Sequence, residues 1–197
     1  MSLFGQTPES RFWTWFQRHV DALFMVKTGD ESICDELAKE LDRIDPRLTF
    51  EFGSVEAGKR EFIITAEGDK DAFPAVIALG QAAPRLTRWT IIKFRPSRPD
   101  FTQVTFANVT VDARTVEFVA EPDGDKTGLV ISVPGLKATN DKAYERAVYI
   151  LLDGMLGEYA VETRVGFIDI IAAEGRPPGA WRPLTRVREA VNASERP

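Results

Sequence analysis

The chain has 197 residues, of which 44% are hydrophobic and 28% charged, and a net charge of −5. This composition is typical of a globular protein that buries a core without disulfides or a structural metal. Its apolar runs are much shorter than the roughly 20 residues of a membrane-spanning helix, which excludes a membrane protein of that kind.

Cys34 is the only cysteine, so no disulfide can form within the chain, as in proteins of reducing compartments. The N-terminus lacks a basic start followed by an apolar core, the pattern of a secretory signal. We therefore expect a soluble, cytoplasmic protein.

The charge is unevenly distributed. Residues 1–83 hold 9 Lys and Arg against 15 Asp and Glu, whereas residues 84–197 hold 16 against 15. The overall acidity argues against nucleic-acid binding, while the arginines of the second half are compatible with an acidic partner or a small anion.

Two amphipathic helices are predicted over residues 8–45. Thr7-Pro8-Glu9 is a typical helix start, and the apolar face that follows predicts a helix to about Lys27, before Thr28-Gly29-Asp30. The second helix has apolar residues at helical spacing and is closed by Pro46: Ile33, Leu37, Leu41 and Ile44.

A first ββαβ unit is predicted over residues 48–95. Its elements are strands Leu48–Phe52 and Arg60–Ala66, a helix from Asp69 or Asp71 to about Ala82, and a strand Arg88–Phe94.

A second ββαβ unit is predicted over residues 114–171. Its elements are strands Arg114–Ala120 and Gly128–Val133, a helix capped by Asn140 that runs to about Met155, and a strand Val165–Ile171. A hairpin of Gln103–Phe106 and Thr110–Val111 links the units, and the tail 172–197 has room for a short helix, Leu184–Val191.

The two units align in three places, which predicts an internal duplication. Glu51-Phe52 matches Glu117-Phe118, Ile63-Ile64 matches Val130-Ile131, and Ile92-Lys93-Phe94 matches Ile168-Asp169-Ile170. The alternative is that ordinary patterning produced two similar units. We expect a single α/β (α+β) domain over 1–197, in which helices cover a mixed sheet; whether the units form one sheet or two stays open.

Two segments resemble binding loops but lack essential residues. The run from Gly53 to Lys59 nearly matches a phosphate-binding loop, but Arg60 replaces the hydroxyl residue and a strand follows where that loop needs a helix. Asp123-Gly124-Asp125 lacks the spaced ligands of a calcium loop. Both segments therefore predict hairpin turns.

The only histidine, His19, falls within the apolar arc of the first helix, which favours a partly buried structural role. With one histidine and one cysteine in the chain, neither a zinc site nor a catalytic triad can be assembled convincingly. Trp15 sits at the edge of the same apolar arc, where it can face a partner protein.

The residues most suited to an anion are Arg95 and Arg98, which leave the end of a strand next to prolines. Arginines at such an edge can hold a carboxylate or phosphate, although a solvated loop whose prolines blunt a sheet edge is the favoured explanation. Gly157 is expected to cap a helix in a left-handed conformation. Glu158 follows it as a candidate base if it is buried and as a solvated residue if not.

Three segments resemble a group of uncharacterised bacterial proteins: Phe12-Trp13-Thr14-Trp15-Phe16, Leu48–Gly53 with Arg60–Ala66, and Ala82–Pro84 followed by Trp89–Pro96. The resemblance covers most of the chain to about residue 171. It implies a bacterial cytoplasmic origin and assigns no activity and no functional residue.

Two functional hypotheses follow. The first is a non-enzymatic binding or regulatory protein that engages another protein near Trp15, with no cofactor or metal. The second is a binder of, or enzyme acting on, a small anion in a cleft between the repeats, with Arg95, Arg98 and Glu158 as its contacts. The sequence predicts neither nucleic-acid nor membrane binding, and it leaves the oligomeric state open.

Overall fold

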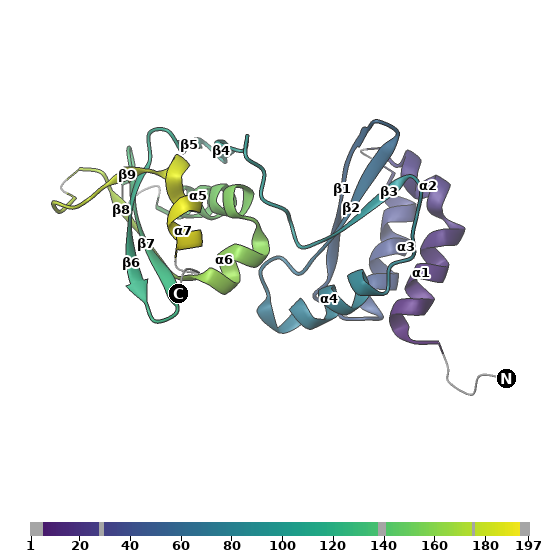
Figure 1. Cartoon of the computed structure of the whole chain (residues 1–197). Helices are drawn as coiled ribbons and strands as arrows, with labels where there is room; N and C mark the ends of the chain where they lie inside the picture. The colour runs from purple at the N-terminus through teal and green to yellow at the C-terminus, as the bar shows by residue number, and fades with distance from the viewer. Residues whose placement is uncertain (1–5, 28–29, 138–140, 175, 194–197) are drawn as a thin grey trace. The chain divides into compact units, whose positions relative to one another are not determined.

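The computed structural model describes residues 6–27, 30–137, 141–174 and 176–193 of the chain. The chain divides into two compact units, Met1–Arg95 (unit 1) and Pro96–Pro197 (unit 2), shown in Figure 1. Both units combine helices with β-sheet, as predicted, and the division falls at the end of the first predicted ββαβ unit. Among the described residues, no helix has the length and apolar character needed to cross a membrane.

Unit 1 begins with three helices, followed by a three-stranded sheet into which one further helix is inserted. Its elements are α1 (Pro8–Arg18), α2 (Val20–Met25), α3 (Glu31–Asp42), β1 (Thr49–Glu56), β2 (Lys59–Thr65), the 3-10 turn η1 (Lys70–Ala72), α4 (Phe73–Gln81) and β3 (Trp89–Lys93).

The first helix starts as predicted but is interrupted at His19. The Thr7 hydroxyl accepts a hydrogen bond from the backbone N–H of Ser10 at 3.2 Å, and Pro8 occupies the first helical position. His19, with φ −107° and ψ 10°, ends α1 and starts α2. On one straight helix Phe24 would lie about 120° around the axis from Phe12. The interruption allows both residues to be buried in the same core.

The sheet of unit 1 has the order β1-β2-β3, with β1 antiparallel and β3 parallel to β2. Ala57 and Gly58, with φ of 49° and 75°, turn the chain between β1 and β2. Two positive φ values match a tight hairpin turn, so the predicted turn in this segment is confirmed. The strand β1 continues to Glu56, beyond the predicted end at Phe52.

Figure 1 shows α1, α2 and α3 along one side of the sheet of unit 1. Their apolar faces and α4 form one core with the sheet, rich in aromatic rings. The ring of Phe62 in β2 lies at its centre, 4.9 Å from Phe16 and 5.7 Å from Phe52 between ring centroids. The fully or almost fully buried members are Phe12, Trp13, Phe16, Leu23, Leu37, Leu41, Phe62, Ile64, Val76 and Leu79.

Unit 2 begins with a separate hairpin and continues with a four-stranded sheet. Its elements are β4 (Gln103–Phe106), β5 (Val109–Asp112), β6 (Glu117–Asp123), β7 (Lys126–Val133), α5 (Asp141–Leu156), α6 (Glu158–Arg164), β8 (Val165–Ala172), β9 (Arg182–Pro183), the 3-10 turn η2 (Leu184–Arg186) and α7 (Val187–Ala193).

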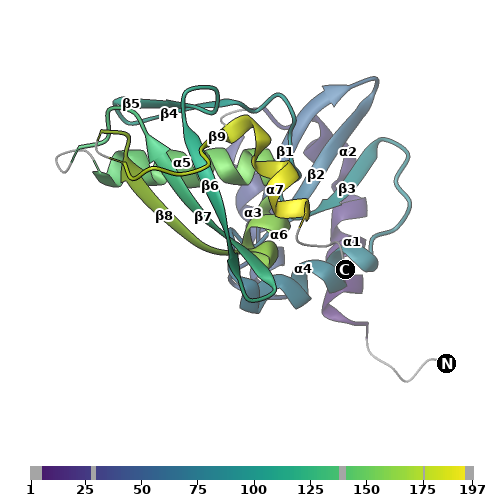
Figure 2. The ribbon, with the colours of Figure 1, turned by 60° about the vertical axis from the view of Figure 1, so that its left-hand side comes forward.

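The sheet of unit 2 has the order β8-β7-β6-β9. The strand β7 runs antiparallel to β6 and parallel to β8, and Figure 2 shows these strands in front of α5. Gly124, with φ 62°, lies in the turn between β6 and β7, which confirms a hairpin in place of a calcium loop. The expected Asn140 cap of α5 lies outside the described residues.

The core of unit 2 is built mainly from aliphatic side chains of β6, β7, α5 and α7, with Val104, Val109 and Val111 of the β4–β5 hairpin. Its fully or almost fully buried members include Val116, Phe118, Leu129, Ile131, Val148, Leu151, Leu152, Leu184, Val187 and Val191. The two units therefore have separate cores with different chemistry. The expectation of one domain over 1–197 stays a prediction.

Both units contain the order β-β-α-β, with an antiparallel hairpin followed by a parallel pair. The strands are aligned less closely than the sequence suggests. With Ile63 matched to Val130, their antiparallel partners are Glu51 and Val119, two residues away from the predicted match of Glu51 with Glu117. Ile63 pairs with Ile92 in unit 1, so the alignment places Val130 beside Ile168, but Val130 pairs with Asp169. The parallel pair of unit 2 is thus shifted by one residue relative to that of unit 1.

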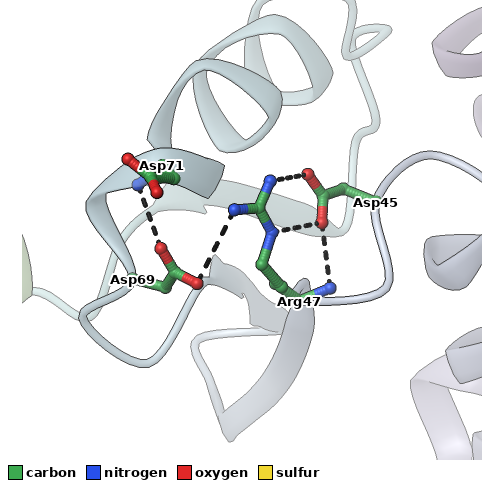
Figure 3. A network of polar contacts seen from close by, with 4 residues as sticks. All are labelled: Asp45, Arg47, Asp69 and Asp71. Carbon is green, nitrogen blue, oxygen red and sulfur yellow. Dashed lines mark hydrogen bonds and ion pairs between the residues drawn. The ribbon is translucent and has the colours of Figure 1, made fainter.

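A polar network joins the loop that follows α3 to the start of η1 (Figure 3). The Arg47 guanidinium donates to both carboxylate oxygens of Asp45, at 2.9 and 2.7 Å, and lies 3.7 Å from Asp69. Asp69 in turn accepts from the backbone N–H of Asp71 at 3.0 Å. Arg47 holds the pKa of the Asp45 carboxyl at about 2 through these hydrogen bonds.

Candidate functional site

An open groove of about 930 Å³ runs between α2 and α3 on unit 1. We call it the α2–α3 groove. Ten described residues line it: Ala22, Met25, Val26, Asp30, Glu31, Ser32, Ile33, Asp35, Glu36 and Lys39. Apolar side chains from both helices thus lie beside a group of carboxylates.

Met25 is the most exposed large apolar side chain of the described residues, with 63% of its surface accessible. It is the last residue of α2, and its neighbours Leu23 and Phe24 are buried in the core. The sequence of α2 therefore uses Leu23 and Phe24 for packing and leaves Met25 in the groove, with the exposed Ala22. An unbranched thioether adapts readily to an apolar partner.

Arg60 of β2 fixes the end of α2 and with it the position of Met25. Its Nη1 donates to the carbonyl oxygens of Leu23, Phe24 and Val26 at 2.9–3.0 Å, and its Nε donates to Gly53 O at 3.0 Å. The last carbonyls of a helix lack partners within the helix, and a cation suits their negative end. Burial lowers the pKa of this guanidinium.

The carboxylates of the groove come from the start of α3. Glu31, Asp35 and Glu36 are exposed and form no ion pair with any described residue, and Lys39 is the single cation among the lining residues. Asp30 accepts a hydrogen bond from the backbone N–H of Lys27 at 2.9 Å. The groove therefore presents a local excess of negative charge.

Cys34 also lies at this end of α3 and is half-buried. Burial raises the pKa of its thiol, and the nearby carboxylates of Asp30 and Asp35 raise it further. Since the thiolate is the reactive form, the environment of Cys34 disfavours nucleophilic chemistry.

Trp15, the residue predicted to face a partner, is half-buried and packs against the core of unit 1. Its ring stacks on the imidazole of His19 at a centroid distance of 4.4 Å, and His19 Nδ1 lies 2.9 Å from Trp15 O. Trp15 is not among the described residues that line the groove. Sequence periodicity located the aromatic helix but missed Met25, which follows the interruption at His19.

Arg95, proposed as an anion contact, lies beside two carboxylates of unit 1. Its Nε is 2.7 Å from Glu51, and its Nη2 is 3.7 Å from Glu67. An incoming anion would have to compete with both carboxylates. Arg98 is exposed and belongs to unit 2, where its backbone N–H donates to Gly154 O at 2.8 Å.

Glu158 is buried, with 1% of its surface exposed, at the start of α6. Gly157 before it has φ 86° and ψ 147°, so the predicted positive φ is present, but the conformation is not that of a left-handed helix. The sequence did not predict α6, because Gly157 was assumed to end the helical region. A cleft that unites Arg95, Arg98 and Glu158 stays a prediction.

A smaller pocket of about 180 Å³ lies on unit 2 between α5 and β8. Asp141, Glu145 and Tyr149 line it from α5, and Asp169 from β8. Burial raises the pKa of the Tyr149 hydroxyl, and Glu145, Glu162 and Asp169 raise it further. Within the described ranges, no group of three or more histidine, cysteine or acidic side chains is arranged to hold a metal ion.

Comparisons with models of protein families, with curated proteins and with solved structures found no match to this chain. In the part of the chain that the structure describes, the α2–α3 groove places the most exposed large apolar side chain, Met25, beside a group of carboxylates.

Proposed function

We propose that the chain is a non-enzymatic binding protein that engages another protein through the α2–α3 groove. The observation that carries this proposal is the exposure of Met25, 63%, in a groove that also contains Val26 and Ile33. Exposed apolar side chains gathered in a depression rimmed by polar residues are characteristic of protein-binding sites. Trp15 remains a proposed additional contact.

Affinity capture from lysate of the native cells tests this function, using the complete chain and two matched variants. Met25→Asp places a charge in the groove, while Val55→Asp changes an exposed apolar residue, 52% accessible, on β1. We expect a protein that is retained by the wild type and by Val55→Asp but lost with Met25→Asp. Identical capture by all three chains, or no capture by any, contradicts the proposal.

The alternative of a small anionic ligand is supported less well. Arg95 lies within 2.7 Å of Glu51 and 3.7 Å of Glu67, so carboxylates of the same unit already offset its charge. A thermal-shift screen against nucleotides, sugar phosphates and organic acids tests this alternative. A ligand at 100 times its Kd stabilises the fold by about 2.7 kcal/mol, and Arg95→Ala and Arg98→Ala should abolish the shift.

We also propose that the two ββαβ units arose by duplication. The turn that precedes the first strand of each unit supports this origin. Asp112 accepts from the backbone N–H and the Nε of Arg114 at 2.9 and 3.0 Å, as Asp45 does from Arg47 at 3.0 and 2.9 Å. On this proposal the copies diverged after the duplication, because the strand pairs of the two units differ from the sequence matches.

A further inference from the structure

We infer that the partner presents a basic amphipathic segment to the α2–α3 groove. Its apolar side chains would contact Met25, Val26 and Ile33, and its Lys or Arg side chains would meet the carboxylates of α3. This inference rests on the proposed function and adds the chemistry of the partner to it.

The apolar side chains of the groove come from α2, the residue after it and α3, and they differ in how much of their surface is exposed. Ala22 and Met25 of α2 are exposed, whereas Val26 and Ile33 are half-buried. A narrow apolar strip of this kind suits the apolar face of a single helix or extended segment, which docks through a few anchors.

The charged part contains four carboxylates and one ammonium group: Asp30, Glu31, Asp35, Glu36 and Lys39. Glu31 lies in the first turn of α3, where the positive end of the helix stabilises a carboxylate. This effect declines beyond the first turn. It does not account for Asp35 and Glu36, and like charges four residues apart, as at Glu31 and Asp35, disfavour a helix.

Four acidic residues elsewhere in the chain are paired with an arginine two or three positions away. Glu40 pairs with Arg43, Asp45 with Arg47, Asp112 with Arg114 and Glu189 with Arg186. Among the described residues, the carboxylates of Glu31, Asp35 and Glu36 have no such pairing. Charge complementarity therefore favours a basic occupant of the groove.

A second copy of this chain fits the groove less well. Among the arginines near the C-terminal end, Arg176 contacts Glu117, Arg186 pairs with Glu189, and Arg188 donates to Ser97 Oγ and Met155 O. These contacts engage three of the arginines of that region within the chain. The groove thus favours a different protein.

The probe for the test is a fluorescein-labelled synthetic peptide of Leu and Lys at helical spacing, about 18 residues long so that it can form a helix. Fluorescence anisotropy with the complete chain measures its Kd at low and high salt. A matched peptide with Glu in place of Lys is the control ligand. We expect the Lys peptide alone to bind, and its affinity to fall as salt screens the carboxylates.

The matched variants are Asp35→Lys/Glu36→Lys in the groove and Glu121→Lys/Asp125→Lys on unit 2. Both change the net charge equally, and all four residues are exposed. We expect the groove variant to raise the Kd about tenfold or more and the unit 2 variant to change it much less. Circular dichroism checks that both variants remain folded.

Equal loss of affinity in the two variants, binding of the Glu peptide, or no binding of the Lys peptide overturns the inference. If Met25→Asp still abolishes capture of a native protein, the proposed function survives and only the chemistry of the partner is wrong. If the Lys peptide binds through Asp35 and Glu36 but capture does not depend on Met25, the proposed function fails instead.

Discussion

At the scale of single residues, Arg60 connects parts of unit 1 that are distant in sequence. It supplies three hydrogen bonds to the end of α2 and one to Gly53, and its guanidinium lies 4.6 Å from the centre of the Phe52 ring. The same residue is what distinguishes the Gly53–Arg60 segment from a phosphate-binding loop. Arg60 stands where a phosphate-binding loop has a hydroxyl residue, and its side chain has a structural role at that position.

Arg60→Ala is expected to lower the free energy of unfolding by about 2–3 kcal/mol, because it leaves carbonyl groups of α2 without donors. Arg60→Lys should restore only part of this, since an ammonium group lacks the planar fork. Urea unfolding followed by circular dichroism measures both. Arg43→Ala, at a side chain 70% exposed, is the control and should cost no more than about 0.5 kcal/mol. An equal cost for both alanine variants contradicts the role of Arg60.

Asp45 provides a prediction for the pH dependence of stability. Its pKa is lowered from 3.8 to about 2 in the folded chain, so the charged carboxylate stabilises the fold above about pH 4. This contribution is lost as the pH falls through about 2. Asp45→Asn should therefore be less stable than the wild type at neutral pH, and the difference should shrink between pH 4 and 2.

Thermal unfolding of both chains across this pH range measures the difference, and NMR titration of the Asp45 carboxyl measures its pKa directly. Arg47→Ala should return that pKa toward 3.8. Glu56→Gln, at an exposed carboxylate of unit 1, is the control. A pKa that does not respond to Arg47→Ala contradicts the assignment of Arg47 as its cause.

At the scale of elements, sequence patterning located most helices and strands, because an amphipathic period marks the helices and short apolar runs bounded by turns mark the buried strands β2 and β7. It missed the interruption at His19 and the helix α6, since both depend on the tertiary packing of Phe24 and Glu158 and not on local propensity. The sequence contains one further signal of the duplication. Asp45-Pro46-Arg47 and Asp112-Ala113-Arg114 lie 67 positions apart, the same offset as Ile63-Ile64 and Val130-Ile131.

The candidate site was predicted much less completely than the fold. Met25 carries no sequence motif, and its exposure results from Arg60 and the interruption at His19. The acidic start of α3 was visible only as part of the negative charge of residues 1–83. A groove between two helices requires their relative positions, which the spacing of apolar residues does not supply.

Two glycines within helices, Gly154 and Gly80, differ in the side chain that an added methyl group would meet. A Cβ on Gly154 of α5 would lie 2.0 Å from the Phe101 ring, whereas one on Gly80 of α4 would lie 2.3 Å from Cγ of Lys93, an aliphatic chain that must rotate away to make room. Gly154→Ala should therefore destabilise the protein by about 1–3 kcal/mol, despite the higher helix propensity of alanine. Gly80→Ala should leave stability unchanged or raise it by up to about 1 kcal/mol.

Chemical unfolding of the two variants measures these effects, and Phe101→Ala in combination with Gly154→Ala checks the cause. The double variant should lose less stability than the two single changes together, because the clash is removed. Additive losses would show that Phe101 does not limit Gly154.

At the scale of the whole molecule, two separate cores suggest that each unit can fold without the other. The core of unit 1 contains only residues up to and including Phe94, and the core of unit 2 contains only residues after it. Possession of its own core is the main physical requirement of a domain.

Polypeptides of residues 1–95 and 96–197 are each expected to unfold in a cooperative thermal transition with a positive heat-capacity change. Differential scanning calorimetry and the dispersion of NMR spectra measure this. If either polypeptide lacks a cooperative transition while the complete chain unfolds in one step, the expectation of a single domain over 1–197 is supported instead.

The hydrogen bonds of Arg60 have a consequence for biosynthesis. The carbonyls of Leu23, Phe24 and Val26 receive the hydrogen bonds of Arg60 only after the ribosome has made β2, and the parallel strand β3 is made later still. Until then the aromatic faces of the first helices remain accessible to chaperones and to other nascent chains. Translation through the segment that ends at Lys93 is therefore the period in which aggregation of this protein is most to be expected.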